Sequence, residues 1–169
     1  MIELTQSWSH INSGSYHIAG LRAMREALAQ EFAVLGGEAE VIPLSPLDQI
    51  DANGNAEKLD MAEALSIRKR PDAPIQVLLV GHMDTVYGPE HPFQSTRFDG
   101  ENILNGPGVA DLKGGLAVML TALAAFERSP LKEKLGWQVL LNPDEEIGSI
   151  ASDPLLKQAA QGENARAGL

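Results

Sequence analysis

Residues 75–84 read Ile-Gln-Val-Leu-Leu-Val-Gly-His-Met-Asp, an apolar strand pattern that ends in two side chains capable of chemistry. The continuous apolar run at 77–80 is typical of a strand covered on both faces of an α/β sheet. His82 and Asp84 follow where this strand ends, and ligands of open α/β sheets bind at the carboxyl ends of strands. Alternate residues of an extended chain share one side, so the imidazole and the carboxylate can approach each other. Taken alone, this motif has an alternative interpretation: the His-x-Asp pair only forms a hydrogen bond within a turn and has no role in chemistry.

Toward the N-terminus, apolar residues at helical spacing predict a helix after the polar cluster at 12–15, with Ser15 as its N-cap. Gly36 and Gly37 are expected to end it. Residues 38–44 predict a short edge strand, because Pro43 cannot donate to a ladder. Residues 45–74 are polar and irregular, with a weak helical pattern at 57–67.

Toward the C-terminus, strand and helix patterns continue to alternate. Residues 97–105 predict a hairpin that turns at Asp99 and Gly100. Gly114 begins a helix with one buried apolar face. Residues 137–141 predict a buried strand, and an amphipathic helix is expected over 150–161. This alternation favours the α/β class.

The 169-residue chain has 13 Lys and Arg, 23 Asp and Glu, a formal net charge of −10 and no cysteine. An acidic surface repels phosphate groups, so we expect neither nucleic acid nor an anionic membrane as a partner. Disulfide bonds, thiolate ligands and Cys nucleophiles are excluded. A metal ion would need His, Asp and Glu ligands, which suits zinc or manganese. No uninterrupted apolar run reaches the ~18 residues of a membrane span, and the N-terminus has no leader pattern, so we expect a cytoplasmic protein.

A second polar patch, at 105–115, reads Asn-Gly-Pro-Gly-Val-Ala-Asp-Leu-Lys-Gly-Gly and directly precedes the helix that begins at Gly114. Asp111 is its only acidic residue, and the surrounding glycines permit close backbone approach and unusual dihedral angles. An N-cap role is the alternative for Asp111, but it does not account for the glycines. Lys113 is expected to be a structural or solvated charge.

A third patch, Asn-Pro-Asp-Glu-Glu at 142–146, follows the strand predicted at 137–141. Three adjacent carboxylates repel one another unless a cation or water compensates. A solvated acidic loop is the alternative. Together, the three patches place His, Asp and Glu on separate elements, which is the inventory of a metal hydrolase.

These patches, in this order, resemble the motifs of the M20 family of zinc metallopeptidases, which includes glutamate carboxypeptidase, aminoacylases and related amidohydrolases. The matching segments are Gly-His-Met-Asp-Thr-Val at 81–86, Gly-Pro-Gly-Val-Ala-Asp-Leu-Lys-Gly-Gly at 106–115 and Asn-Pro-Asp-Glu-Glu-Ile-Gly-Ser at 142–149. The resemblance implies a three-layer α/β fold of the zinc-exopeptidase type, with a mostly parallel sheet flanked by helices. It also implies hydrolysis of peptide or N-acyl amide bonds.

The resemblance implies a role for each matching residue. His82 and Glu146 would be terminal ligands of two different zinc ions, and Asp111 would bridge both ions. Asp84 would orient His82, and Glu145 would be the general base toward a metal-activated water. Family members also have a cis peptide bond after the bridging Asp, which predicts a cis bond between Asp111 and Leu112.

Family members carry a further acidic ligand and a histidine ligand beyond these motifs, and a lid or dimerisation domain. The chain ends at Leu169 before any of these, so we expect residues 1–169 to be the N-terminal segment of a catalytic domain. Such a segment would bind zinc weakly and be weakly active or inactive. Its sheet would be incomplete at the C-terminus, and exposed edges would favour association of copies. The other histidines, His10, His17 and His91, are expected at the surface or in loops.

Two other functions are compatible with an α/β chain of this composition. A non-catalytic binding or interaction module that retains the fold is the alternative to the hydrolase. A nucleotide-binding domain has little support, because no G-x-G-x-x-G follows a strand and no P-loop is present. The expected partner is a small peptide or N-acyl amino acid, and the sequence does not name which one.

Overall fold

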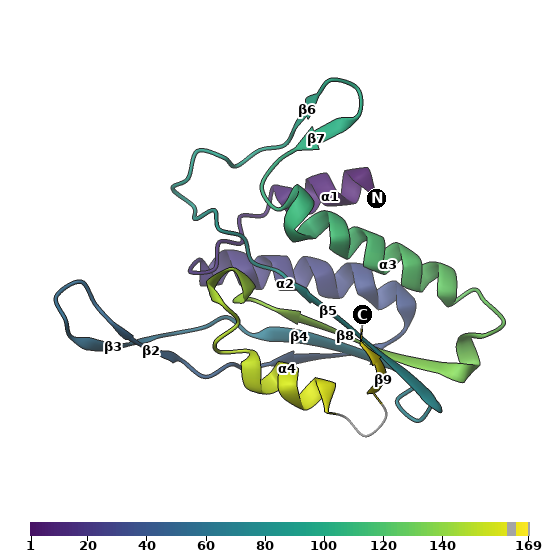
Figure 1. The fold of residues 1–169 in the computed structure, drawn as a ribbon. Coiled ribbons are helices and arrows are strands. Elements are labelled where there is room, and N and C mark those ends of the chain that lie inside the picture. The colour runs from purple at the N-terminus through teal and green to yellow at the C-terminus, as the bar shows by residue number, and fades with distance from the viewer. Residues whose placement is uncertain (162–164, 169) are drawn as a thin grey trace.

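The computed structural model describes residues 1–161 and 165–168. Two helices come first, strands β1 to β7 follow in succession, and helices and strands alternate only from η2 to β9 (Figure 1). The elements are α1 (Ile2–Ser9), α2 (Ile18–Phe32), η1 (Ala33–Leu35), β1 (Glu38–Ile42), β2 (Leu47–Ile50), β3 (Ala56–Leu59), β4 (Ala64–Lys69), β5 (Ile75–His82), β6 (Arg97–Asp99), β7 (Ile103–Asn105), η2 (Val109–Lys113), α3 (Gly114–Phe126), η3 (Lys132–Lys134), β8 (Leu135–Asn142), η4 (Glu145–Ile147), α4 (Asp153–Ala160) and β9 (Ala165–Gly168).

A five-stranded sheet in the order β1-β4-β8-β5-β9 forms the centre of the molecule. The β8–β5 and β5–β9 pairs are parallel, whereas β1–β4 and β4–β8 are antiparallel. The predicted α/β class and the helical layers are confirmed, but the sheet is mixed rather than mostly parallel. α2 and α3 lie on one face and α4 lies on the other (Figure 1). β1 is at an edge, as Pro43 predicts.

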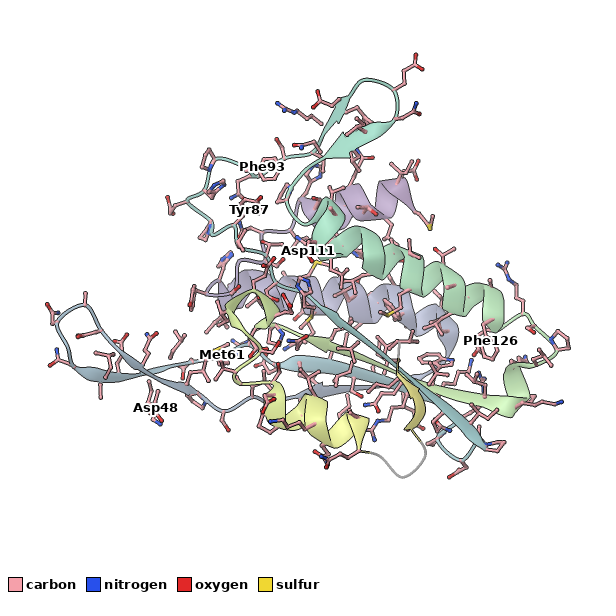
Figure 2. The ribbon with its side chains drawn as sticks, viewed as in Figure 1. Asp48, Met61, Tyr87, Phe93, Asp111 and Phe126 are labelled. Atoms are coloured by element: carbon pink, nitrogen blue, oxygen red, sulfur yellow. The ribbon has the colours of Figure 1, made fainter. Side chains whose placement is uncertain are left out.

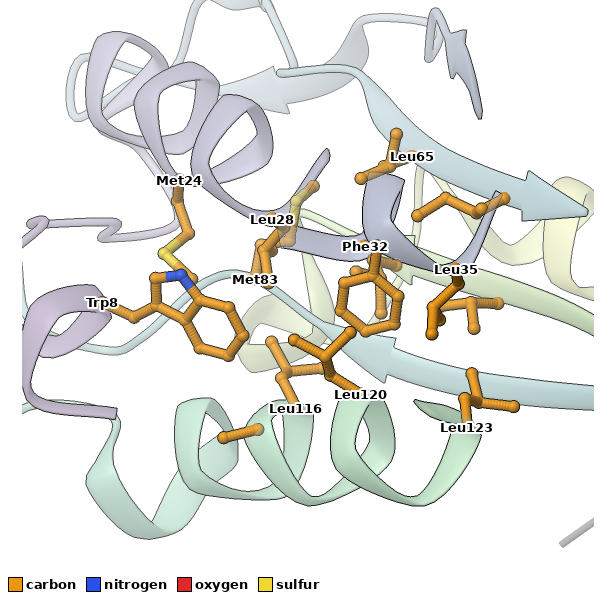
Figure 3. Close-up of a cluster of buried hydrophobic side chains, with 14 of the residues drawn as sticks. Trp8, Met24, Leu28, Phe32, Leu35, Leu65, Met83, Leu116, Leu120 and Leu123 are labelled. Carbon is orange, nitrogen blue, oxygen red and sulfur yellow. The ribbon is translucent and has the colours of Figure 1, made fainter. Parts of the chain in front are cut away.

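The core lies between the sheet and the layer formed by α1, α2 and α3. Apolar side chains of all these elements are almost fully buried there, because each helix turns one apolar stripe toward the sheet. Figure 3 shows this cluster in close-up. Its most buried members include Trp8, Leu21, Met24, Leu28, Phe32, Leu65, Ile67, Met83, Leu116, Val139 and Leu141.

Two predictions of local structure need correction. The helix that the weak pattern at 57–67 suggests does not form, since β3 and β4 occupy most of this segment. β4 is a central strand because it pairs with β1 and β8, and such tertiary contacts override weak local propensity. β5 is less covered than its apolar run suggests: Ile75 is 46% exposed and Val80 is 44% exposed.

Three local predictions are confirmed. Gly36 has a φ of +67° just after the turn that ends α2, and β6 and β7 form the hairpin around Gly100. α4 lies within the segment predicted to be helical. α1 was not predicted. The β2–β3 hairpin, which carries Asp48, extends away from the sheet (Figure 2).

The segment Val109–Phe126 is long and apolar enough, by length and composition alone, to cross a membrane, with a mean hydropathy of 1.6. The segment contains Asp111 and Lys113, so it is not an uninterrupted apolar run. Leu116, Leu120 and Leu123 of this segment are buried in the core, and 28% of the segment is buried. Core helices of water-soluble proteins meet the same criterion, so this finding is weak evidence for a membrane span.

Glu127, just after α3, is the centre of a charged cluster at the far end of the sheet from His82. Its carboxylate accepts hydrogen bonds from Arg70 and from Trp137 Nε1 at 2.9 Å, and it pairs with Lys69 Nζ at 2.7 Å. The bonds from Arg70 outweigh burial and lower the pKa of Glu127 to about 2.

We expect the ion pairs and hydrogen bonds of Glu127 to make the free energy of unfolding depend on pH. The folded-state pKa is depressed, so its contribution is present above the ordinary pKa of 4.5 and is lost as the pH falls toward 2. The free energy of unfolding should fall by about 2 kcal/mol more in the wild type than in Glu127→Gln over this range. Urea denaturation at pH 6 and pH 2.5 measures this. Equal acid losses in the two proteins would contradict the assignment.

Candidate metal centre and catalytic site

The first and third polar patches meet because β5 and β8 are neighbouring parallel strands. His82, the last residue of β5, lies opposite Asn142, the last residue of β8. The backbone N–H of Met83 then donates to the Asn142 carbonyl at 2.8 Å, so the two loops leave the sheet together. Ends of parallel strands meet at one rim, which brings residues 82–84 and 144–146 together.

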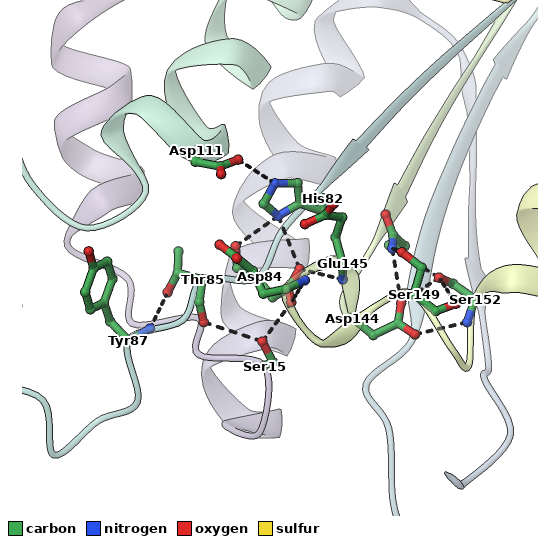
Figure 4. A network of polar contacts seen from close by, with 12 residues as sticks. Ser15, His82, Asp84, Thr85, Tyr87, Asp111, Asp144, Glu145, Ser149 and Ser152 are labelled. Atoms are coloured by element: carbon green, nitrogen blue, oxygen red, sulfur yellow. Dashed lines mark hydrogen bonds and ion pairs between the residues drawn. The ribbon is translucent and has the colours of Figure 1, made fainter.

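His82 is buried and is held at both ring nitrogens (Figure 4). Its Nδ1 lies 3.1 Å from the Asp84 carbonyl oxygen and 3.2 Å from Asp84 Oδ1. Its Nε2 lies 2.9 Å from Asp111 Oδ1. Burial lowers the pKa of His82, but the hydrogen bonds to Asp84 and Asp111 outweigh it and raise the pKa to about 9.

Asp84 is 1% exposed and joins the first patch to the third. Besides its contact with His82, Oδ1 accepts a hydrogen bond from the backbone N–H of Glu145 at 3.1 Å. Oδ2 accepts one from the backbone N–H of Glu146, also at 3.1 Å, and one from Ser15 Oγ at 2.8 Å. These four donors satisfy a buried carboxylate, which would otherwise be costly to desolvate.

Asp111 comes to the site from the turn η2, where its φ of −133° and ψ of 98° interrupt the helical backbone. The Asp111–Leu112 peptide bond is cis, as the family resemblance predicted. Its side chain is 72% exposed, so one carboxylate oxygen contacts His82 while the group remains accessible from solvent. Asp111 is therefore not an N-cap, and α3 begins three residues later.

The two glutamates are fixed through their backbone rather than their side chains. Glu145 is exposed, and Figure 4 shows it beside the His82–Asp84 pair. Glu146 is half-buried, and burial raises its pKa, with the nearby carboxylates of Asp111 and Asp84 acting in the same direction. Over residues 1–161 and 165–168, no group of three or more His, Asp or Glu side chains is close enough to hold an ion.

The donor chemistry nevertheless fits zinc. Imidazole and carboxylate are its ordinary ligands in a chain without cysteine. Asp84 occupies Nδ1 of His82, which leaves Nε2 facing Asp111 as the nitrogen that would bind a zinc ion. A carboxylate on the second ring nitrogen is the usual support of a zinc-binding histidine. The roles of His82, Asp111 and Glu146 as ligands stay predictions.

Asp144, the third carboxylate of the acidic run, has a structural role instead. It is fully buried, and its oxygens accept hydrogen bonds from the N–H groups of Ala151 and Ser152 and from Ser152 Oγ. Asn142 Nδ2 donates to it at 3.1 Å. These bonds close the loop that carries Glu145 and Glu146, so the run is neither a solvated loop nor three equivalent ligands.

Of two further residues near the site, Ser15 differs from its expected role, whereas Lys113 is structural, one of the two roles expected for it. Ser15 is not the N-cap of α2, because its hydroxyl donates to Asp84 and α2 begins after His17 without a side-chain cap. Lys113 is buried, which lowers its pKa to about 8, and its Nζ donates to the Ile11 carbonyl at 2.8 Å. The stem of Lys113 passes Gly108, whose φ is +71° and where a Cβ would meet Lys113 carbons. No spacing rule in the sequence signals either contact.

The sequence model of peptidase family M20/M25/M40 matches residues 78–169, which contain all three patches. This chain belongs to that family. Carboxypeptidase G2 from Pseudomonas sp. (strain RS-16) is 39% identical to this chain over 89 residues. The match covers 50% of this chain and 20% of carboxypeptidase G2. Succinyl-diaminopimelate desuccinylase from Albidiferax ferrireducens is 30% identical over 148 residues, 84% of this chain and 36% of the relative.

The fold agrees with that of solved M20-like enzymes. Human carnosine dipeptidase 1 superposes with a TM-score of 0.74 and 19% identity, covering 95% of this chain and 35% of that structure. The chain thus spans between a fifth and little more than a third of the length of these proteins. The family to which the chain belongs is a family of peptidases.

Proposed function

We propose that this chain supplies a zinc site and the general base of a hydrolase that cleaves peptide or N-acyl amide bonds. The observation that carries the proposal is the set of contacts around Asp84. This one buried carboxylate touches His82 and holds the backbone of both Glu145 and Glu146. His82, in turn, contacts Asp111. All five residues of the proposed machinery therefore belong to one hydrogen-bonded unit.

In this proposal His82, Asp111 and Glu146 would hold two zinc ions, with Asp111 shared between them. Bound zinc would lower the pKa of water and polarise the substrate carbonyl. Glu145 is exposed and beside this unit, so its carboxylate can take a proton from the attacking water as the C–O bond forms. The same group can return that proton to the leaving nitrogen as the C–N bond breaks. Asp84 keeps the His82 ring in one orientation.

The proposal is tested by zinc titration of the 169-residue chain with calorimetry. We expect His82→Ala to lose most of the zinc affinity, because it removes the one nitrogen ligand of the proposed set. His10→Ala is the matched control, since it removes an exposed imidazole that bonds only to Thr96 among the described residues. Equal zinc affinity in the wild type and in His82→Ala would overturn the proposed site.

A further inference from the structure

A cavity of about 360 Å³ adjoins the candidate site. Three separate segments form its walls, and its lining residues are Gly14, Ser15, Tyr16, His17, Thr85, Val86, Gly88, Pro89, Glu146 and Ile147. We propose that this cavity binds an uncharged, apolar group that flanks the scissile amide, such as an aliphatic side chain. This inference rests on the proposed function and adds the class of substrate to it.

The cavity is connected to the candidate site through residues that the two share. Glu146, a proposed ligand, is part of the wall. Ser15, which also lines the cavity, donates its hydroxyl hydrogen to Asp84, and Thr85 directly follows Asp84 in the chain. A group held in this space therefore lies next to the carboxylates that would act on the amide.

The walls are held by hydrogen bonds within the chain, so the cavity does not need a ligand to form. The N–H of Ser15 donates to the Thr85 carbonyl at 3.2 Å, and the N–H of Thr85 donates to the Ser13 carbonyl at 2.9 Å. Farther along this loop, Tyr87 packs edge-to-face on Phe93 with ring centroids 5.0 Å apart (Figure 2). A preformed cavity reduces the entropy cost of binding.

Asn12 determines which nitrogen of His17 can meet a ligand. Its Nδ2 donates to the Tyr87 carbonyl at 3.0 Å and to Gln94 Oε1 at 2.8 Å, so Oδ1 is the acceptor that faces His17 Nδ1 at 2.9 Å. Nδ1 therefore carries the hydrogen, and Nε2 is left to accept a hydrogen bond from a ligand N–H. A Cβ on Gly20 would overlap both the Asn12 carbonyl and this ring, so only glycine leaves room for them.

The charge and size of the cavity favour an uncharged group. Tyr16, Val86, Pro89 and Ile147 contribute apolar surface, and Glu146 is the charged carboxylate of the wall. Within the described part of the chain, no Lys or Arg lines this space. In the zinc-free chain an anionic group would be repelled by Glu146, and the volume is at the lower end for small-molecule sites, which suits one side chain.

The first test compares N-acetyl-leucinamide with the α-amide of N-acetyl-aspartate, because these side chains are similar in shape and differ in charge. Binding to the zinc-free chain is followed by the backbone amide signals of Gly14 and Gly88 in NMR titrations. We expect the leucine compound to shift both signals and to bind about tenfold more tightly. Equal dissociation constants, or shifts confined to residues outside the wall, would overturn the inference.

Two variants sharpen the test. A Cβ on Gly88 meets no atom within 4 Å, so Gly88→Leu can enter the cavity without a backbone clash, and it should weaken leucinamide binding about tenfold. Ala122→Leu, at an exposed position of α3, is the matched control and should leave binding unchanged. Val86→Lys should reverse the preference toward the aspartate compound. Unchanged affinities in Gly88→Leu and Val86→Lys, with folded spectra, would contradict the cavity as the binding site.

These results separate the inference from the proposed function. Leucinamide binding at the wall, in a chain that binds no zinc, would support the cavity and refute the metal site. Zinc binding that depends on His82, together with no shift at Gly14 or Gly88, would support the metal site and refute the cavity.

Discussion

Replacing Glu145 with glutamine is expected to slow amide hydrolysis by about 10²–10⁴-fold and to leave zinc affinity nearly unchanged. Glutamine has the shape of glutamate but cannot accept a proton at neutral pH. The backbone N–H of residue 145, which donates to Asp84, is kept in this variant, so the loop should stay in place. Release of the free amino acid from an N-acyl amino acid measures the rate, and calorimetry measures zinc affinity.

Glu101→Gln is the matched control for this change, because Glu101 is exposed between β6 and β7. It should hydrolyse the same substrate at the wild-type rate. Full activity in Glu145→Gln would show that another group takes the proton. A loss of zinc affinity in Glu145→Gln would instead place Glu145 among the ligands.

Asp84→Asn should have the second large effect, and it should act on both folding and zinc. The asparagine retains one acceptor oxygen, so its NH₂ group would face donors that now bond to a carboxylate oxygen. We expect the free energy of unfolding to fall by about 3–5 kcal/mol and zinc affinity to fall by about 10–100-fold. Urea denaturation and zinc titration measure the two effects.

Ser15→Ala separates the contribution of one hydrogen bond from that of the whole carboxylate. It removes a single donor to Asp84 Oδ2 and leaves the contacts to His82, Glu145 and Glu146 intact. We expect the free energy of unfolding to fall by about 1.5 kcal/mol and the zinc affinity to change little. Equal losses in Ser15→Ala and Asp84→Asn would mean that Asp84 does not connect the patches as described.

The parts of the fold that could be predicted from the sequence are those where local pattern and tertiary role agree. The apolar run at 77–80 and the strand at 137–141 are neighbours in the sheet, and both end at the predicted site. β4 could not be predicted from its own residues. Its Ala64 and Ser66 have low strand propensity, and the element exists because β1 and β8 pair with its two edges.

The candidate site likewise has residues that the local sequence pattern predicts and residues that it does not. His82, Asp84 and Asp111 were predicted from their places beside strand ends and glycines, and His82 lies within hydrogen-bonding distance of both carboxylates. Ser15 was interpreted as a helix cap because polar residues before an apolar stripe usually have that role. Its true partner is Asp84, 69 positions away, and no local pattern carries that information.

The separations around Asp84 have a consequence for synthesis on the ribosome. Ser15 is made first, but the N–H groups of Glu145 and Glu146 follow Asp84 by 61 and 62 residues. When only the first half of the chain has left the ribosome, the Asp84 carboxylate can therefore meet Ser15, but Glu145 and Glu146 have not yet been translated. Because distant contacts form slowly, the acidic centre should be among the last regions of the protein to become protected from exchange with solvent.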